Sequence, residues 1–311
     1  MPSYTGLVDE TLDRPLRLDR YAAERLALLS RSQLKARCVS AFVNDKPVKI
    51  SYLVKAGDRL SLTWTASEPL DLIPEDLPLT VLYEDERLVV INKEQGMVVH
   101  PGAGNHRGTL ANALLFRRAQ RGSAPIGATT APSWRQGIVH RLDKDTSGVM
   151  IAAYNDETRA FLAAQFKNRH VRKLYAAIVQ GTPPEQAGVI ETFITRDSRD
   201  RTRFTASARD GKAAVTRYRV LRSWGAYSLL LLRPKTGRTH QLRVHLRHLG
   251  HPILGDPIYG VKDTRFPAVS LMLHAKTLGI ALPGDEEACR RVFVAPLPPR
   301  FLAVVRALSG G

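Results

Sequence analysis

The segment from His140 to Gly148 carries residue types that could perform chemistry on a sugar or a base. It reads His-Arg-Leu-Asp-Lys-Asp-Thr-Ser-Gly, so two carboxylates, Asp143 and Asp145, stand among cations and hydroxyls. The preceding Gly137-Ile138-Val139 is typical of a short strand that runs into a turn, and an aspartate there can project into a cleft. Alone, the pattern also fits a structural role, in which Asp143 caps the turn or pairs with Arg141.

The charge of the chain narrows the class of partner. Lys and Arg total 46 against 29 Asp and Glu, which gives a formal net charge of +17. Such a surface attracts polyanions, so nucleic acid is the first partner to expect.

No apolar run approaches the roughly 18 residues of a spanning helix, and the first residues do not resemble a secretory signal. Cys38 and Cys289 lie far apart in sequence and indicate no disulfide framework, so we expect a cytoplasmic protein without a membrane partner.

Short strand-like segments recur from Leu79 onward and predict a sheet that dominates the larger part of the chain. The segment Leu174–Gln180 is apolar on both faces, which predicts a central strand. The full set of expected strands is 79–83, 88–92, 149–154, 174–180, 189–194, 213–221 and 227–232.

Two helices are predicted between these strands. One covers about residues 156–168, where Asp156 and Glu157 place acids at the helix start. The other follows Gly237, with Thr239 as its N-cap and leucines at helical spacing on one face. The opposite face carries His240, Arg243 and Arg247 and is therefore cationic.

Several blocks of sequence together resemble the RluA-type pseudouridine synthase family, in its RluC/RluD-like branch that acts on large-subunit ribosomal RNA. The blocks are Val81–Asp85, Val90–Lys93, Val98–Gly102, His140–Asp143, Lys173–Gly181 and Thr236–His245. The resemblance implies an α+β pseudouridine synthase fold with a mixed, largely antiparallel central sheet. It also implies isomerisation of uridine in RNA, without a cofactor or a metal.

The resemblance assigns roles to individual residues. The family's catalytic aspartate corresponds to Asp143, its charge partner to Arg243 and its active-site tyrosine to Tyr175. Arg141 corresponds to the cation that takes the place of the extruded base. The residues expected to bind substrate are Arg141, His140, Leu142, Lys173, Arg238, His240 and Gln241. Histidines 240, 245, 248 and 251 are clustered, but arginines between them would repel a metal ion.

The N-terminal part resembles a small S4-like α/β RNA-binding module. The predicted organisation is a polar tail at 1–13, the S4-like domain at 14–63, a proline-rich linker at 64–78 and the catalytic domain at 79–311. Residues expected to bind RNA in the module are Arg17, Arg20, Ser30, Arg31, Gln33 and Lys35.

The favoured hypothesis is an RNA pseudouridine synthase that acts on structured RNA, most of all on large-subunit ribosomal RNA. We expect a monomer without an obligate protein partner, as the resemblance implies. Two alternatives remain open. One is a non-catalytic RNA-binding or ribosome-assembly factor, and the other is a uridine glycosidase that releases free uracil.

Overall fold

The structure of the 311-residue chain, a computed structural model, describes residues 1–29, 31–65, 72–102, 105–122, 137–200, 202–285 and 289–310. The chain divides into two compact units, Met1–Asp71 and Leu72–Gly311. The predicted linker at 64–78 spans the boundary between them, and its residues 66–71 lie outside the described ones.

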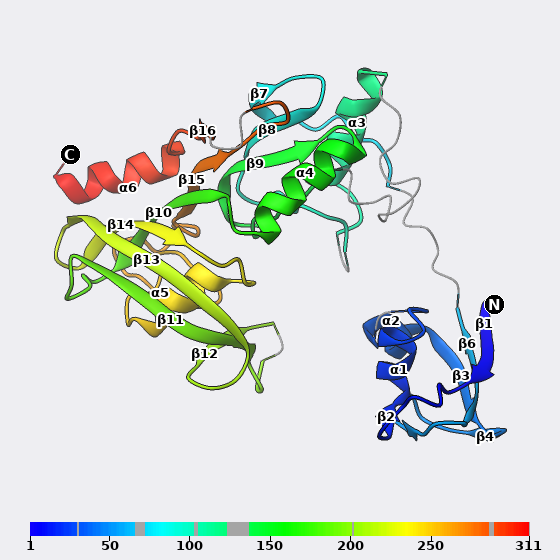
Figure 1. Cartoon of the computed structure of the whole chain (residues 1–311). Helices are drawn as coiled ribbons and strands as arrows, with labels where there is room; N and C mark the ends of the chain where they lie inside the picture. Colours follow the sequence, from blue (N-terminus) through cyan, green and yellow to red (C-terminus); the bar gives the residue numbers. More distant parts are fainter. Residues whose placement is uncertain are drawn as a thin grey trace. The chain divides into compact units, whose positions relative to one another are not determined.

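The first unit combines two short helices with a small antiparallel sheet (Figure 1). Tyr21, Leu34 and Leu60 are almost completely buried within it, so the unit has a hydrophobic core of its own. The helices are α1 (Leu18–Glu24) and α2 (Arg31–Arg37), and the sheet has the order β1 (Ser3–Leu7), β6 (Arg59–Trp64), β3 (Cys38–Val43), β4 (Lys46–Pro47). A separate pair is formed by β2 (Leu16–Arg17) and β5 (Leu53–Val54).

Residues 3–7 form a strand, whereas the sequence analysis placed them in a polar tail. Ser3 pairs with Thr63 and Leu7 with Arg59, in antiparallel register at the edge of the small sheet. Its sequence, Ser-Tyr-Thr-Gly-Leu, is mostly polar or small and none of the five residues is fully buried, so no apolar face identifies this strand in the sequence. Backbone hydrogen bonds to β6 define it instead.

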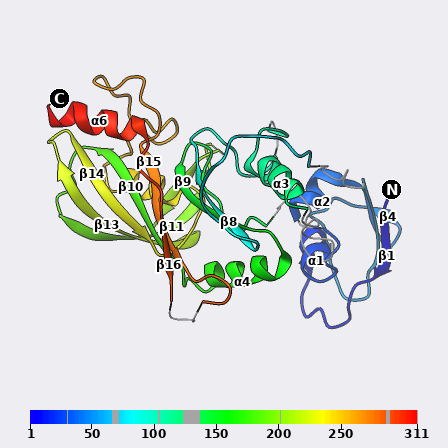
Figure 2. The same ribbon diagram turned by 90° about the horizontal axis from the view of Figure 1, so that it is seen from above.

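A ten-stranded mixed sheet forms the centre of the second unit, as the sequence predicts (Figures 1 and 2). Its order is β12-β11-β13-β14-β10-β15-β9-β8-β7, with β16 paired to β15. All of its described strand pairs are antiparallel except β9 with β15. The strand β10 lies in the middle, in agreement with its two apolar faces. The strands are β7 (Thr80–Glu84), β8 (Leu88–Lys93), β9 (Ser147–Ala153), β10 (Arg172–Gln180), β11 (Ala187–Arg196), β12 (Phe204–Ser207), β13 (Lys212–Ser223), β14 (Tyr227–Pro234), β15 (Leu273–Ile280) and β16 (Arg291–Val294).

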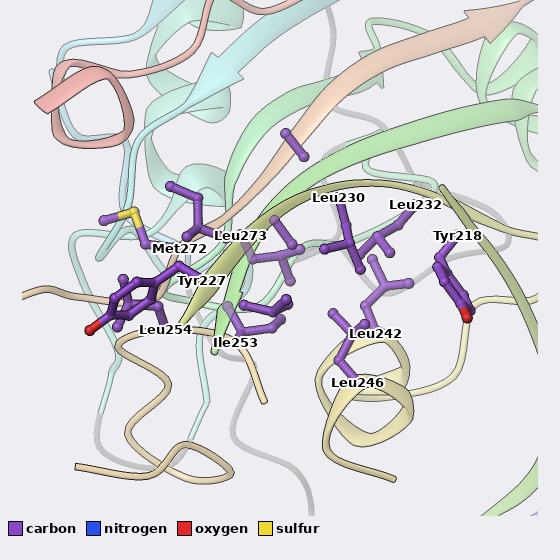
Figure 3. Close-up of a cluster of buried hydrophobic side chains, with 14 of the residues drawn as sticks. Tyr218, Tyr227, Leu230, Leu232, Leu242, Leu246, Ile253, Leu254, Met272 and Leu273 are labelled. Carbon is purple, nitrogen blue, oxygen red and sulfur yellow. The ribbon is translucent and has the colours of Figure 1, made fainter. Parts of the chain in front are cut away.

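Helices pack against this sheet. Leu242 and Leu246 of α5 lie in one buried cluster with Leu230 and Leu232 of β14, as Figure 3 shows. The same cluster includes Phe301 of α6, so both helices are anchored to the centre of the sheet. The helices are α3 (Leu110–Gln120), α4 (Asp156–Lys167), α5 (Gln241–His248) and α6 (Pro299–Ser309).

The N-cap of α5 is His240, so the predicted cap at Thr239 is wrong. His240 adopts a left-handed conformation, with φ 55° and ψ 17°, and its side chain makes no capping hydrogen bond. The Gln241 side chain stabilises the turn instead, because its Oε1 accepts from the Arg238 backbone N–H at 2.9 Å and from the Thr236 hydroxyl at 2.7 Å. This turn sets the direction in which His240 and the helix leave β14.

The parallel contact between β9 and β15 requires a glycine. Gly148 has φ +121° and pairs with Ala275, and a Cβ on Gly148 would lie 2.2 Å from the carbonyl oxygen of Ala275. No side chain fits at that distance. The strand that follows the His140–Asp143 segment is thereby held close to the centre of the sheet.

We expect Gly148→Ala to destabilise the protein by about 3 kcal/mol or more, because it combines a forbidden φ with a backbone clash. Gly225→Ala is the matched control. Gly225 also has a positive φ, +73°, but an added Cβ meets no atom within 4 Å, so its cost should be about 1–2 kcal/mol. Chemical denaturation measures both, and equal losses would contradict the close approach.

Candidate active site

Asp143 lies at the end of an extended segment that is anchored by His140. The backbone N–H of Ile151 in β9 donates to Nε2 of His140 at 3.0 Å. The His140 ring also stacks on Phe166 of α4, with ring centroids 4.5 Å apart. Burial lowers the pKa of His140 to about 3, so the ring stays neutral and continues to accept the bond. His140 therefore links the segment to both β9 and α4.

A buried lysine holds the turn that follows Asp143. Nζ of Lys93 donates to the carbonyl oxygens of Glu94 at 2.8 Å, Met97 at 2.9 Å and Lys144 at 3.0 Å. Burial lowers the pKa of Lys93 to about 8, although neighbouring carboxylates favour its charged form. The sequence analysis gave Lys93 no role. Its three partners are main-chain oxygens, which no sequence pattern reveals.

Arg243 of α5 lies between two carboxylates. Its Nε and Nη2 donate to Asp256 at 2.8 Å and 2.7 Å, and its Nη1 donates to Oδ2 of Asp143 at 3.4 Å. Asp256 also accepts the backbone N–H groups of Ile258 and Tyr259. Burial would raise the pKa of Asp256, but these bonds and the charge of Arg243 hold it below its usual value. Asp256 thus fixes Arg243, which turns its remaining nitrogen toward Asp143.

A cavity of about 470 Å³ opens beside Asp143. Asp143 is the only acidic side chain among the described residues that line it, so the cavity suits an anionic ligand. Its cationic lining residues are Arg141, Lys167, Arg169, Lys173, Lys235, Arg238 and Arg243.

Tyr175 of β10 forms part of the cavity wall, and its partly buried ring packs against two hydrophobic clusters. Burial and the charge of Asp143 raise the pKa of Tyr175 above its usual value. The hydroxyl therefore keeps its proton at neutral pH. The ring offers an apolar face to a flat ligand, and the hydroxyl can donate a hydrogen bond.

His240 approaches Asp143 from the α5 side of the cavity. Its Nε2 lies 3.9 Å from Oδ2 of Asp143, which is beyond hydrogen-bonding distance. Its Nδ1 lies 2.8 Å from the hydroxyl of Tyr259, and that oxygen accepts the backbone N–H of Phe204. The arrangement lets the hydroxyl donate to Nδ1 and leaves the hydrogen of the neutral ring on Nε2. Burial lowers the pKa of His240, which favours this neutral form.

All seven residues expected to bind substrate line this cavity, but protein contacts hold several of them. The oxygen and the nitrogen of the Gln241 side-chain amide both form hydrogen bonds with protein groups. Leu142 belongs to a buried cluster. Nε of Arg238 donates to the carbonyl oxygen of Ala213 at 3.1 Å. Arg141 is exposed and Lys173 half-buried, so these two cations are the more available to a ligand.

A comparison with protein families identifies the chain. Residues 87–248 match the family model described as RNA pseudouridylate synthase. The chain belongs to this family. The matched residues include Asp143, Tyr175 and Arg243.

Individual relatives and a solved structure that resemble this chain also carry the names of pseudouridine or pseudouridylate synthases. The "Ribosomal large subunit pseudouridine synthase D" of Borreliella burgdorferi is 41% identical, over 93% of this chain and 89% of its own length. The protein of the same name from Zymomonas mobilis is 44% identical, over 86% of each chain. The structure titled "Human RNA Pseudouridylate Synthase Domain Containing 4" has a TM-score of 0.59 and 30% identity, and covers 74% of this chain and 93% of its own.

Five of the residues expected to bind RNA in the first unit of this pseudouridine synthase are described, and they lie on and beside its two helices. Arg17 and Arg31 both pair with Asp19, at 3.0 Å and 3.3 Å, and Arg20 pairs with Glu24. The charges of the three arginines are thus partly compensated within the unit. Lys35 and Gln33 lie on α2 with exposed side chains, and Ser30 lies outside the described residues.

We expect Asp256→Asn to weaken the two shortest hydrogen bonds of the buried Arg243 guanidinium, leaving Asp143 at 3.4 Å as its carboxylate partner, and to cost about 3–5 kcal/mol of stability. Because the folded-state pKa of Asp256 lies below the unfolded value of about 3.9, its contribution is complete above that pH. It is lost as the pH falls through the lower, folded-state pKa. Urea denaturation from neutral to acid pH should therefore show a difference between wild type and variant that narrows in acid. A constant difference would contradict the ion pair.

Proposed function

We propose that this pseudouridine synthase modifies specific uridines of large-subunit ribosomal RNA. Relatives that carry this substrate in their names are 41% and 44% identical to it. The observation that carries the proposal is the carboxylate of Asp143, paired with a buried guanidinium at the edge of a cavity lined by cations. A nucleotide extruded from RNA matches that cavity in charge, and small-molecule sites have volumes of this order.

The reaction moves the ribose from N1 to C5 of uracil. Asp143, held by Arg243, acts at the sugar, either by attack on C1′ or by assistance of elimination. The N1–C1′ bond breaks, the uracil turns within the cavity, and a C5–C1′ bond forms. C5 then loses its proton and N1 gains one, so the product is an isomer of the substrate. Tyr175 packs against the base, and its hydroxyl holds or moves a proton.

Extrusion of the uridine requires a side chain that replaces the base in the RNA stack and a pocket that excludes water from around the base. The exposed Arg141 beside Asp143 takes the vacated position in this proposal. Leu142 and Tyr175 supply apolar surface within the cavity. Exclusion of water there favours return of the detached uracil to the sugar over hydrolysis.

The first unit acts in this proposal as an S4-like RNA-binding module through Arg17, Arg20, Arg31, Gln33 and Lys35. Its separate core supports an independent domain, and the formal charge of +17 supports an RNA partner. A monomer is the state that the family resemblance implies. No helix in the described part of the chain is long and apolar enough to cross a membrane. A ribosomal RNA substrate supports a cytoplasmic location.

We expect Asp143→Asn to reduce pseudouridine formation on the order of a thousandfold or more, because the variant keeps the shape but loses the negative charge. Chemical mapping of pseudouridine in large-subunit ribosomal RNA, taken from cells that lack the protein, measures the product. Asp145→Asn is the matched control, since Asp145 lies in the same turn but does not line the cavity. Undiminished product from Asp143→Asn would refute the assignment.

The same assay separates the alternatives. Release of free uracil into solution would indicate a glycosidase. An RNA-binding or assembly factor would leave the RNA unmodified, and cells with Asp143→Asn would behave as wild type.

A further inference from the structure

We propose that the cavity contains a phosphate-binding subsite, formed by Arg169 and Lys173, which takes a phosphodiester group next to the extruded uridine. The subsite rests on the proposed function and adds residues that the chemical steps do not use. Two independent features carry it. One is the backbone conformation of Arg169, and the other is the surroundings of the Lys173 ammonium group.

Arg169 follows α4 in a conformation that normally selects glycine. The N–H of His170 donates to the carbonyl oxygen of Gln165 at 2.9 Å, and the N–H of Arg169 donates to that of Phe166 at 3.3 Å. These two bonds form a Schellman motif, whose left-handed residue is usually glycine. Arg169 occupies that position with φ 61°. A side chain there costs conformational energy, and such outliers gather at ligand-binding sites.

Lys173 enters the cavity without a polar partner among the residues that the structure describes. Lys93 and Lys276 in the same unit donate to main-chain oxygens, but Nζ of Lys173 forms no hydrogen bond or ion pair with any described residue. A Cβ on Gly237 would lie 3.8 Å from this Nζ, so the ammonium reaches the wall formed by the β14–α5 turn. Burial lowers the pKa of Lys173. A bound anion would compensate for the lost hydration.

The end of α4, which Arg169 follows, is tied to the segment that carries Asp143. Phe166 at the end of α4 stacks on His140, three residues before Asp143. Asp143 is held by Arg243, and no other acidic side chain among the described residues lines the cavity, so the two cations of the subsite remain for the ligand. Lys167 lines the same cavity and adds to the positive potential at its mouth.

The chemistry favours a phosphodiester of the substrate RNA. Arg and Lys both bind phosphate oxygens through charge-assisted hydrogen bonds. A uridine that enters the cavity brings a phosphodiester on each side of its ribose, at a fixed distance from the sugar on which Asp143 acts. Free inorganic phosphate shares the binding chemistry, so the experiment separates the two sources.

Arg169→Gly provides a sharp test, because it removes the cation and relieves the strained conformation together. We expect its thermal midpoint to equal or exceed that of the wild type. Its Kd for unmodified large-subunit ribosomal RNA should rise about tenfold, and the slope of log Kd against log salt should fall by about 0.7–1. Lys173→Met should weaken binding in the same way.

Arg172→Gln is the matched control. Arg172 is exposed, lies next to Lys173 on β10 and does not line the cavity, because successive residues of a strand face opposite sides. We expect the control to bind RNA almost as tightly as the wild type. Equal weakening by Arg172→Gln and Arg169→Gly would show a diffuse effect of charge and overturn the subsite, as would wild-type affinity of Arg169→Gly.

A modified substrate identifies the ligand. Once the target uridine is mapped with wild-type enzyme, short RNAs with a neutral methylphosphonate on its 5′ or 3′ side remove one charge at a time. One of the two should weaken wild-type binding about tenfold and leave Arg169→Gly unaffected. Competition by inorganic phosphate at constant ionic strength, without any methylphosphonate effect, would identify a site for free phosphate and overturn the proposal. Absence of any target uridine would instead refute the proposed function.

Discussion

The buried guanidinium of Arg243 is the constraint on which the site depends. A charge removed from water is tolerated only when opposite charges and hydrogen bonds surround it. Asp256 supplies two of those bonds and is itself fixed by backbone N–H groups. Asp143 receives the remaining interaction at 3.4 Å while still facing the cavity. The loop after α5, which carries Asp256, therefore determines how the carboxylate of Asp143 is held.

The other supports of Asp143 come from different parts of the fold. Lys93 ties the turn after it through three carbonyl oxygens, and His140 links the preceding segment to β9 and α4. Gly148 then lets β9 approach β15 closely. Lys93 and Gly148 lie in strands of the ten-stranded sheet, and His140 is bonded to β9 and stacked on α4. Such a scaffold keeps the carboxylate in place while the RNA, with its larger freedom, adjusts to it.

Sequence patterns predicted many of the strands in the second unit, but they missed several shorter or less apolar elements. Runs rich in Val, Ile and Leu identified most strands, and the two apolar faces of β10 placed it in the centre. The strand β15 was not predicted, because Leu273–Ile280 mixes His, Lys and Gly with its apolar residues. The short strands β12 and β16 and the helices α3 and α6 were not predicted either.

The candidate site shows the same division. The family resemblance predicted that Asp143, Tyr175 and Arg243 belong to one site, and the structure places all three at one cavity. Asp256 and Lys93 stood outside that reasoning, because their partners become neighbours only after folding. The strain at Arg169 was invisible too, since a φ of 61° is a property of the backbone and arginine is an ordinary residue after a helix.

The contact between Asp143 and Arg243 joins residues 100 positions apart in the chain. A ribosome that synthesises this protein releases the aspartate well before the arginine, and Asp256 later still. During that interval the growing polypeptide already carries many positive charges but cannot hold its carboxylate in working geometry. The ion pair that holds Asp143 can therefore form only late in synthesis, after most of the polypeptide has left the ribosome.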